Sequence, residues 1–118
     1  MLKYLSWKTI EKETLNPLFD RQLVVGEKVM LARILLKKGA HVPEHSHMNE
    51  QVTHTLKGAL KFRIDGRDIT LGPGEILCIP PHMPHEAWAL EDCEELDVFT
   101  PPREDWINKT DAYLRAQK

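Results

Sequence analysis

The sequence predicts an all-β fold in which short strands form a barrel or a sandwich. Eight prolines and six glycines divide the 118 residues into short apolar stretches, and short strands separated by Gly/Pro turns are typical of such folds. Apolar residues make up 42% of the chain and charged residues 29%, a composition that supports a packed core and excludes a disordered chain. A chain of this length corresponds to one domain, so we expect residues 1–118 to fold as a single unit.

The individual strands are predicted from apolar runs between turn residues. The first 20 residues are weakly patterned, apart from a turn at Asn16-Pro17. Strands follow at residues 22–25, 28–36, 51–56, 60–64, 67–71, 76–79, 85–90 and 96–99, with an extended segment at 40–47. We expect 76–79 to be buried and the acidic stretch 91–95 to be a solvated turn. Two prolines at 101 and 102 end the sheet, and residues 104–115 are predicted to form one short C-terminal helix.

The clearest local signal is a β-hairpin over residues 60–71. The dipeptide Asp65-Gly66 at its centre suits a two-residue type I′ turn, which needs two residues with positive φ. The turn also fixes which residues face each other, and it places apolar pairs on one face and an ion pair on the other. The predicted pairs are Leu60 with Leu71, Phe62 with Ile69, and Arg63 with Asp68.

Charge and hydropathy exclude several classes of protein. Sixteen Lys and Arg against eighteen Asp and Glu give a net charge of −2, which argues against nucleic-acid binding and against a polybasic membrane anchor. The most apolar stretch, residues 29–36, contains Arg33 and is too short to span a bilayer, and the N-terminus lacks a signal-peptide pattern. Two cysteines, Cys78 and Cys93, are too few for a disulfide scaffold. We therefore expect a cytoplasmic protein with no nucleic-acid or membrane partner.

Three histidines and a glutamine predict a metal site. His45 and His47 are two residues apart, so on a strand both rings face the same side, and Gln51 keeps that parity. His85 follows a proline-rich turn at the start of a later strand. Three imidazoles and one amide oxygen from neighbouring strands make a suitable cage for one divalent metal ion with open positions. A lone histidine would more simply be a surface or hydrogen-bonded residue.

The spacing of these residues resembles the two motifs of the cupin family. The segment Gly39-x5-His45-x-His47-x3-Gln51-x6-Gly58 is similar to the first motif, and Gly74-x5-Pro80-x-His82-x2-His85 is similar to the second. The resemblance implies a cupin double-stranded β-helix, or jelly-roll barrel, with its core at about residues 22–100. It also implies that His45, His47, Gln51 and His85 ligate the metal. The sequence departs from the motifs at Gln51, where Glu is usual, at His82, where Gly is usual, and at Ala89, where Asn is frequent.

The glutamine bears on the chemistry of the site. Three neutral imidazoles and an amide cancel none of the charge of a divalent ion, so the site should attract an anion and polarise an oxygen strongly. This favours Lewis-acid chemistry over dioxygen chemistry. Zn, Ni, Fe, Co or Mn would each suit such a ligand set.

The end of the last strand resembles small cupins of the pectin-degradation type. The stretch 97–103 places an aromatic residue and Pro-Pro-Arg after Asp97, and the string from His45 to Gln51 is also shared with these proteins. They linearise 4,5-unsaturated monouronates to open-chain keto sugars. The resemblance implies that Asp97, Phe99 and Arg103 are active-site residues. Arg103 could grip the carboxylate of a small sugar acid, Asp97 could relay a proton, and Phe99 could form an apolar wall beside the ring.

Two other functions remain open from the sequence. One is a metal-dependent cupin dioxygenase, and the other is a non-catalytic cupin that binds a small acid. A homodimer is expected, because a small jelly roll has sheet edges to cover. Four residues receive no role in the site: His41 and His54 are expected near the barrel mouth and on the outer face, His82 in a tight turn, and Cys78 away from the ligands. Ala87 and Ala89 should share the lumen face with His85, and Trp88 should point outward.

Overall fold

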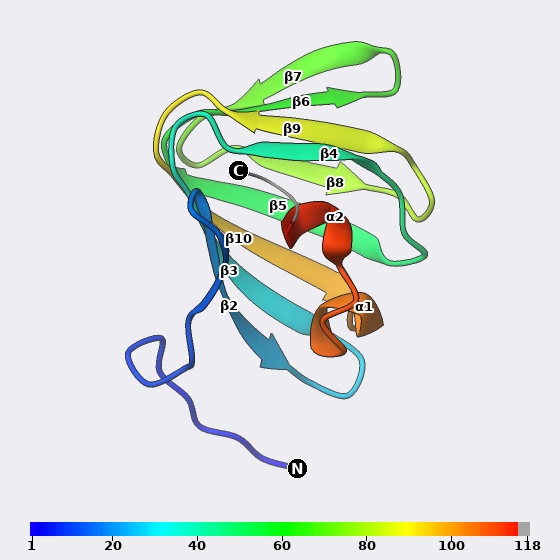
Figure 1. Ribbon diagram of the computed structural model, residues 1–118. Helices are drawn as coiled ribbons and strands as arrows, with labels where there is room; N and C mark the ends of the chain where they lie inside the picture. The colour runs from blue at the N-terminus through cyan, green and yellow to red at the C-terminus, as the bar shows by residue number, and fades with distance from the viewer. Residues whose placement is uncertain (116–118) are drawn as a thin grey trace.

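Two antiparallel β-sheets face each other and form an open barrel in the computed structural model, which describes residues 1–115 (Figure 1). The larger sheet has the strand order β1-β2-β3-β10-β5-β8, and the smaller has β4-β9-β6-β7. The strands of the larger sheet are β1 (Glu13–Asn16), β2 (Phe19–Val25), β3 (Met30–Leu36), β5 (Glu50–Lys57), β8 (Ile76–Ile79) and β10 (Cys93–Thr100). Those of the smaller sheet are β4 (His41–His45), β6 (Leu60–Ile64), β7 (Arg67–Leu71) and β9 (His85–Ala89). The predicted all-β jelly roll is thus confirmed.

The core lies between the two sheets, because alternate residues of each strand point inward. Burial alternates along β3, β9 and β10, so that every second residue is buried. Ala87 and Ala89 are buried on β9 beside His85, whereas Trp88 lies on the outer face and stacks on His41. The inward-facing alanines leave room in the barrel that larger side chains would fill.

The hairpin of β6 and β7 has the predicted register. Asp65 and Gly66 both have positive φ, 52° and 72°, as a type I′ turn requires. The strand partners are Leu60 with Leu71, Phe62 with Ile69, and Arg63 with Asp68. Local turn chemistry and alternation were therefore sufficient to define this element.

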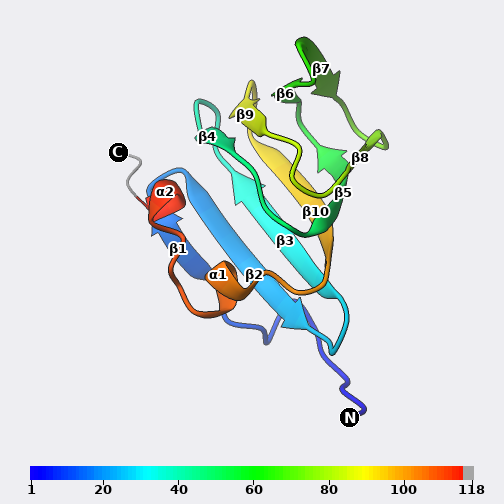
Figure 2. The same cartoon turned by 90° about the vertical axis from the view of Figure 1, so that its right-hand side faces the viewer.

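The C-terminal segment forms two short helical turns, so the prediction of one helix over 104–115 was wrong. Helix α1 spans Glu104–Ile107 and α2 spans Ala112–Arg115, and Lys109 between them has a positive φ of 58°. Helix α2 contacts β1 and β4, the edge strands of the two sheets (Figures 1 and 2). The segment therefore closes one side of the barrel. None of the described helices is long and apolar enough to cross a membrane.

Three further expectations required correction. Strand β1 was not predicted, and it pairs with β2 through a turn in which the Asn16 side chain accepts a hydrogen bond from the Leu18 N–H. Strand β8 lies at a sheet edge, so Ile76 is 57% exposed and 76–79 is not a buried strand. The acidic stretch is only partly a turn, because β10 begins at Cys93 and the side chain of Glu95 is buried.

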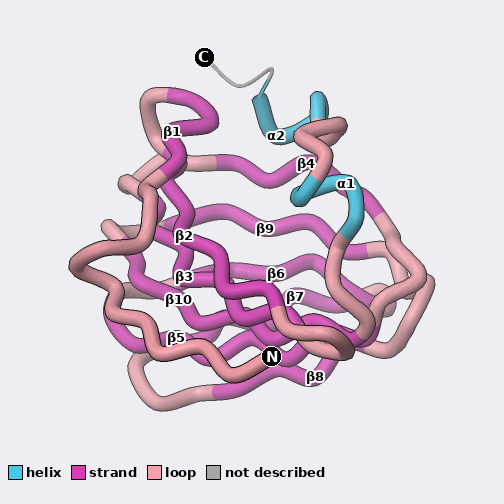
Figure 3. Tube along the Cα trace, turned by 90° about the horizontal axis from the view of Figure 1, so that it is seen from below, coloured by secondary structure: helices cyan, strands magenta, loops and turns pink. Residues whose placement is uncertain are grey.

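The N-terminal residues lie outside the barrel. Figure 3 shows the barrel from below, with the N-terminal loop in front of the larger sheet. Met1, Leu2 and Tyr4 are almost fully exposed. These apolar side chains therefore contact little of the described chain.

Candidate functional site

Three histidines form a cluster at one end of the barrel. His45 ends β4, His85 begins β9, and the two are register partners in the smaller sheet. His47 follows in the loop after β4, so the expectation that it lies on a regular strand with His45 was wrong. Each ring nevertheless offers a nitrogen to one point, and these ligand atoms lie within 4.8 Å of one another.

The backbone fixes which ring nitrogen faces the centre of this cluster. The Nδ1 of each ring contacts a backbone carbonyl two residues away, and a carbonyl only accepts hydrogen bonds, so each Nδ1 carries the proton. For His45, His47 and His85 in turn, the acceptors are Pro43 (2.8 Å), Asn49 (3.1 Å) and Met83 (2.9 Å). Each Nε2 is then an unprotonated lone-pair donor, which is the arrangement found in metal-binding histidines.

Burial keeps these rings neutral. It lowers the pKa of His45 to about 3, with His85 adding to the effect, and that of His47 to about 4, with Arg103 adding to the effect. Burial also lowers the pKa of His85. Because metal ligation needs a neutral imidazole, the cluster has no proton to lose at neutral pH before it binds an ion.

The orientation of the Gln51 side-chain amide shows whether the site suits a cation. Its Nε2 donates to the Thr53 hydroxyl at 2.8 Å, which turns its Oε1 toward the Nε2 of His47 at 3.1 Å. Both of these facing atoms are acceptors when His47 carries its proton on Nδ1. Two lone pairs at this distance repel unless a cation lies between or beside them. The Nε2 of His85 is also buried without a hydrogen-bond partner among residues 1–115. The four side chains therefore fit a divalent cation.

A cavity of about 50 Å³ extends from this cluster into the barrel. It is lined by His45 and His85 of the cluster. It is also lined by Asp97, Phe99 and Arg103, the predicted active-site residues. Asp97 and Phe99 lie on the inward face of β10, with 8% and 1% of their surface exposed, and Arg103 precedes α1 with 2% exposed. The structure thus brings all the sequence-predicted site residues together.

The guanidinium of Arg103 is already engaged. Its Nε and Nη2 donate to the two carboxylate oxygens of Asp105, at 3.0 and 2.8 Å, and Nη2 also donates to the Tyr113 hydroxyl at 2.7 Å. A carboxylate could bind end-on to Nη1 and Nη2 only after displacing Tyr113. The Tyr113 ring lies 4.9 Å from that of His45, so this residue links α2 to both parts of the site.

Two buried carboxyl groups face the cavity. Burial raises the pKa of Asp97 to about 7, although a hydrogen bond from Thr53 and the Arg103 charge oppose the shift. Burial raises the pKa of Glu95 to about 8, with Asp97 adding to the effect against a hydrogen bond from Thr55. Glu95 was not predicted as a site residue, although its parity with Asp97 and Phe99 was a signal for it.

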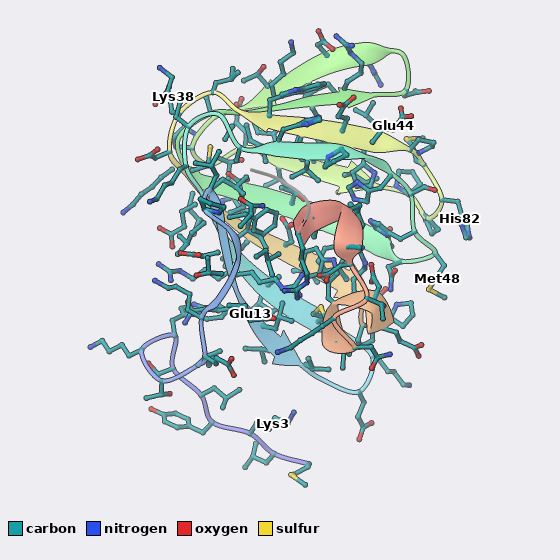
Figure 4. The ribbon with its side chains drawn as sticks, viewed as in Figure 1. Lys3, Glu13, Lys38, Glu44, Met48 and His82 are labelled. Carbon is teal, nitrogen blue, oxygen red and sulfur yellow. The ribbon has the colours of Figure 1, made fainter. Side chains whose placement is uncertain are left out.

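The remaining candidates lie elsewhere, although His41 was expected near the barrel mouth. His41 is on the outer face with Trp88 and contacts Glu86, and His54 faces outward on β5. His82 is exposed in the loop before β9, where Figure 4 shows its side chain pointing away from the barrel. Cys78 is exposed on β8. These four side chains are outside the histidine cluster.

Comparison with known proteins agrees with this architecture. A family model described as a cupin domain matches residues 32–99. The structure of KdgF from Halomonas sp. has a TM-score of 0.84 at 25% identity, covering 90% of this chain and 99% of that one. An RmlC-like cupin from Shewanella frigidimarina also has a TM-score of 0.84, at 27% identity, covering 90% and 96%. An oxalate decarboxylase variant from Bacillus subtilis, at 22% identity and a TM-score of 0.75 over 86% of this chain and 30% of that one, shares the fold alone. None of the curated proteins matches the sequence.

Proposed function

This chain belongs to the cupin family, and we propose that it is a metal-dependent enzyme that opens 4,5-unsaturated monouronates to linear keto sugars. The observation that supports this best is that one cavity joins the histidine cluster to Asp97, Phe99 and Arg103. Such a reaction on a sugar acid needs three groups: a metal site, an acid that can hold a proton at neutral pH, and a cationic side chain that binds the carboxylate. The proposal makes the protein a ring-opening, isomerase-type enzyme acting on a small anionic substrate.

His45, His47, His85 and Gln51 would hold one divalent ion. Such an ion supplies Lewis-acid polarisation of a substrate oxygen. Since the four ligands are neutral, they leave the full charge of the ion available for this purpose. Asp97 and Arg103 lie in the wall of the same cavity, so the chain's own groups act on a substrate that the site has oriented.

The protein residues account for binding and proton transfer. Arg103 would bind the substrate carboxylate once Tyr113 gives up its hydrogen bond, and Phe99 would cover one face of the sugar ring. Asp97 has a pKa of about 7, raised by burial, so it is partly protonated at neutral pH and can deliver a proton to the enol carbon. A pKa close to the working pH is what general acid–base catalysis favours.

The likeness to KdgF supports this substrate class. It extends over 90% of this chain and 99% of that one, with a TM-score of 0.84, so the two proteins share the barrel. The string from His45 to Gln51 and the Asp-x-Phe-x-Pro-Pro-Arg end of β10 resemble the pectin-degradation cupins. Both segments line the cavity, with His45 on the smaller sheet and with Gln51, Asp97 and Phe99 on the larger one.

An ultraviolet assay tests the proposal directly. The conjugated enol ether of a 4,5-unsaturated monouronate absorbs, and the linear keto product does not. We expect metal-loaded protein to remove this absorbance faster than the spontaneous reaction, and chelator-treated protein or the His85→Ala variant to lose that ability. His54→Ala, on the outer face, is the matched control and should retain the activity. A wild-type rate equal to the spontaneous rate would reject the function, and oxygen uptake instead would favour a dioxygenase.

We further propose a cytoplasmic homodimer. Leu2 and Tyr4 on the N-terminal arm and Ile76 on the edge strand β8 are exposed apolar side chains that a second copy could cover. Light scattering on the purified protein should give a mass of two chains. A single-chain mass at micromolar concentration would contradict the dimer.

A further inference from the structure

Glu95 is a buried acid for which the proposed function has so far given no role. It lies on the inward face of β10, only 1% exposed, two residues from Asp97. Among the described residues, the influences on its pKa are burial, Thr55 and Asp97, with no cation among them. A carboxyl in such a place is costly for folding, so its presence at a cavity wall points to a role in the site.

The carboxyl group is held by one oxygen and presents the other to the cavity. Glu95 pairs with Thr55 across β10 and β5, and the Thr55 hydroxyl donates to its Oε1 at 2.6 Å. Its Oε2 is buried and has no hydrogen-bond partner among residues 1–115. Asp97 lies two pairs along, opposite Thr53, and its Oδ1 is likewise buried and unpartnered among residues 1–115. The cavity therefore has two carboxyl groups in its wall, each with an oxygen free for a ligand.

The spacing of the two acids suits the two ends of a sugar ring. Alternate residues of a strand are about 6.6 Å apart, and enzymes that use two carboxyl groups on a sugar hold them about 5 to 9.5 Å apart. Arg103 acts electrostatically on Asp97 and is not among the groups acting on Glu95. If Arg103 binds the substrate carboxylate, Asp97 lies beside the adjacent enol carbon and Glu95 lies toward the hemiacetal.

We propose that Glu95 is a second catalytic acid of this site, which takes the hemiacetal proton of the substrate and resupplies Asp97. This inference rests on the proposed ring-opening function. It adds to that function the group that accepts the proton leaving the hemiacetal hydroxyl.

The proton transfers balance without any further reactant. Asp97 gives its proton to the enol carbon, so that an O–H bond breaks and a C–H bond forms. Glu95 then passes its proton to the carboxylate of Asp97, its neighbour on the inward face of β10. The hemiacetal hydroxyl gives its proton to the Glu95 carboxylate as the ring C–O bond breaks, and the electron pairs released form the two carbonyl groups. The substrate is isomerised, and both acids again hold their protons.

The test compares Glu95→Gln with Glu94→Gln in the metal-loaded protein, using 4,5-unsaturated monouronate as substrate. The amide keeps the shape and the Thr55 contact but cannot carry the proton, so we expect kcat to fall at least about 100-fold with KM within about twofold. Glu94 is the matched control, because it lies next in the chain but on the outer face, bonded to Arg33. Its variant should keep the wild-type kcat.

A spectroscopic readout separates a lost proton from a damaged site. The wild-type protein without substrate should show infrared C=O absorption from two buried protonated carboxyls at pH 7, and Glu95→Gln should lose the larger part of it, leaving the part that belongs to Asp97. Wild-type turnover with an equally active Glu95→Gln variant would overturn the inference and leave the proposed function standing. An inactive wild type would reject the proposed function and this inference together. Absorption that keeps its full wild-type intensity in Glu95→Gln would also overturn the inference, because Glu95 would then hold no proton in the wild type.

Discussion

Replacing Glu95 by glutamine should stabilise the protein, and the gain should depend on pH. The side chain is 1% exposed, and its pKa is raised by burial from 4.5 to about 8. The folded protein therefore keeps a proton that the unfolded chain loses above pH 4.5. As a result, rising pH favours the unfolded wild type between these two pKa values. Glutamine fills the same space without this linkage.

The size of the effect follows from the gap between the two pKa values. Each pH unit above 4.5 costs the wild type about 1.4 kcal/mol until the folded-state carboxyl ionises. At pH 7 the cost is about 3 kcal/mol, and it levels off above about pH 8. The titratable groups on the same inward face are Asp97 and Cys93, and both remain in the variant. The difference between the two proteins therefore reports Glu95 together with its coupling to these two groups.

Guanidinium unfolding followed by circular dichroism at pH 5, 6, 7 and 8 measures this difference. We expect the free energies of unfolding of wild type and Glu95→Gln to be close at pH 5 and to separate by about 3 kcal/mol at pH 7. Glu94→Gln weakens a partly buried ion pair with Arg33 at the barrel surface, so it should destabilise by about 1 kcal/mol. A Glu95→Gln difference that stays constant with pH would refute the reasoning, because Glu95 would then titrate near its ordinary pKa.

Two further variants test the C-terminal segment. Asp111→Asn should destabilise the protein by about 1.5 to 3 kcal/mol in chemical denaturation, because it leaves the fully buried Arg21 with Glu13 as its one carboxylate partner; wild-type stability would contradict this. Tyr113→Phe should tighten the binding of D-galacturonate about tenfold by calorimetry, because it frees an N–H of Arg103 that the phenol now occupies. Tyr4→Phe on the exposed arm is the control, and weaker binding by Tyr113→Phe would show that the hydroxyl contacts the ligand.

The features that could be predicted are those with local causes. The hairpin at residues 60–71 follows from the Asp65-Gly66 turn and the alternation on either side. The histidine cluster follows from motif spacing, even though His47 lies in a loop and not on the strand that parity assumed. The motif spacing predicted the cluster correctly because the loop after β4 places His47 at the same end of the barrel as His45 and His85.

The features that could not be predicted depend on distant parts of the chain. Glu95 was placed in a solvated turn because four acids in five residues suggest exposure, whereas pairing with Thr55 draws this one into the barrel. Counting back from Phe99 in steps of two would have found it. The engagement of Arg103 by Tyr113 offers no such signal, because it depends on how α2 bridges the two sheets.

The unsatisfied polar groups give the strongest physical argument that this cavity is where the protein acts. Among residues 1–115, four buried side-chain atoms lack a hydrogen-bond partner: His85 Nε2, Glu95 Oε2, Asp97 Oδ1 and Trp106 Nε1. All four residues line the same cavity. Each such atom costs about 1 to 3 kcal/mol, a loss that random placement would spread through the core. Their convergence on one space, together with the facing lone pairs of Gln51 and His47, indicates that a cation and a polar ligand complete the site and recover part of this cost.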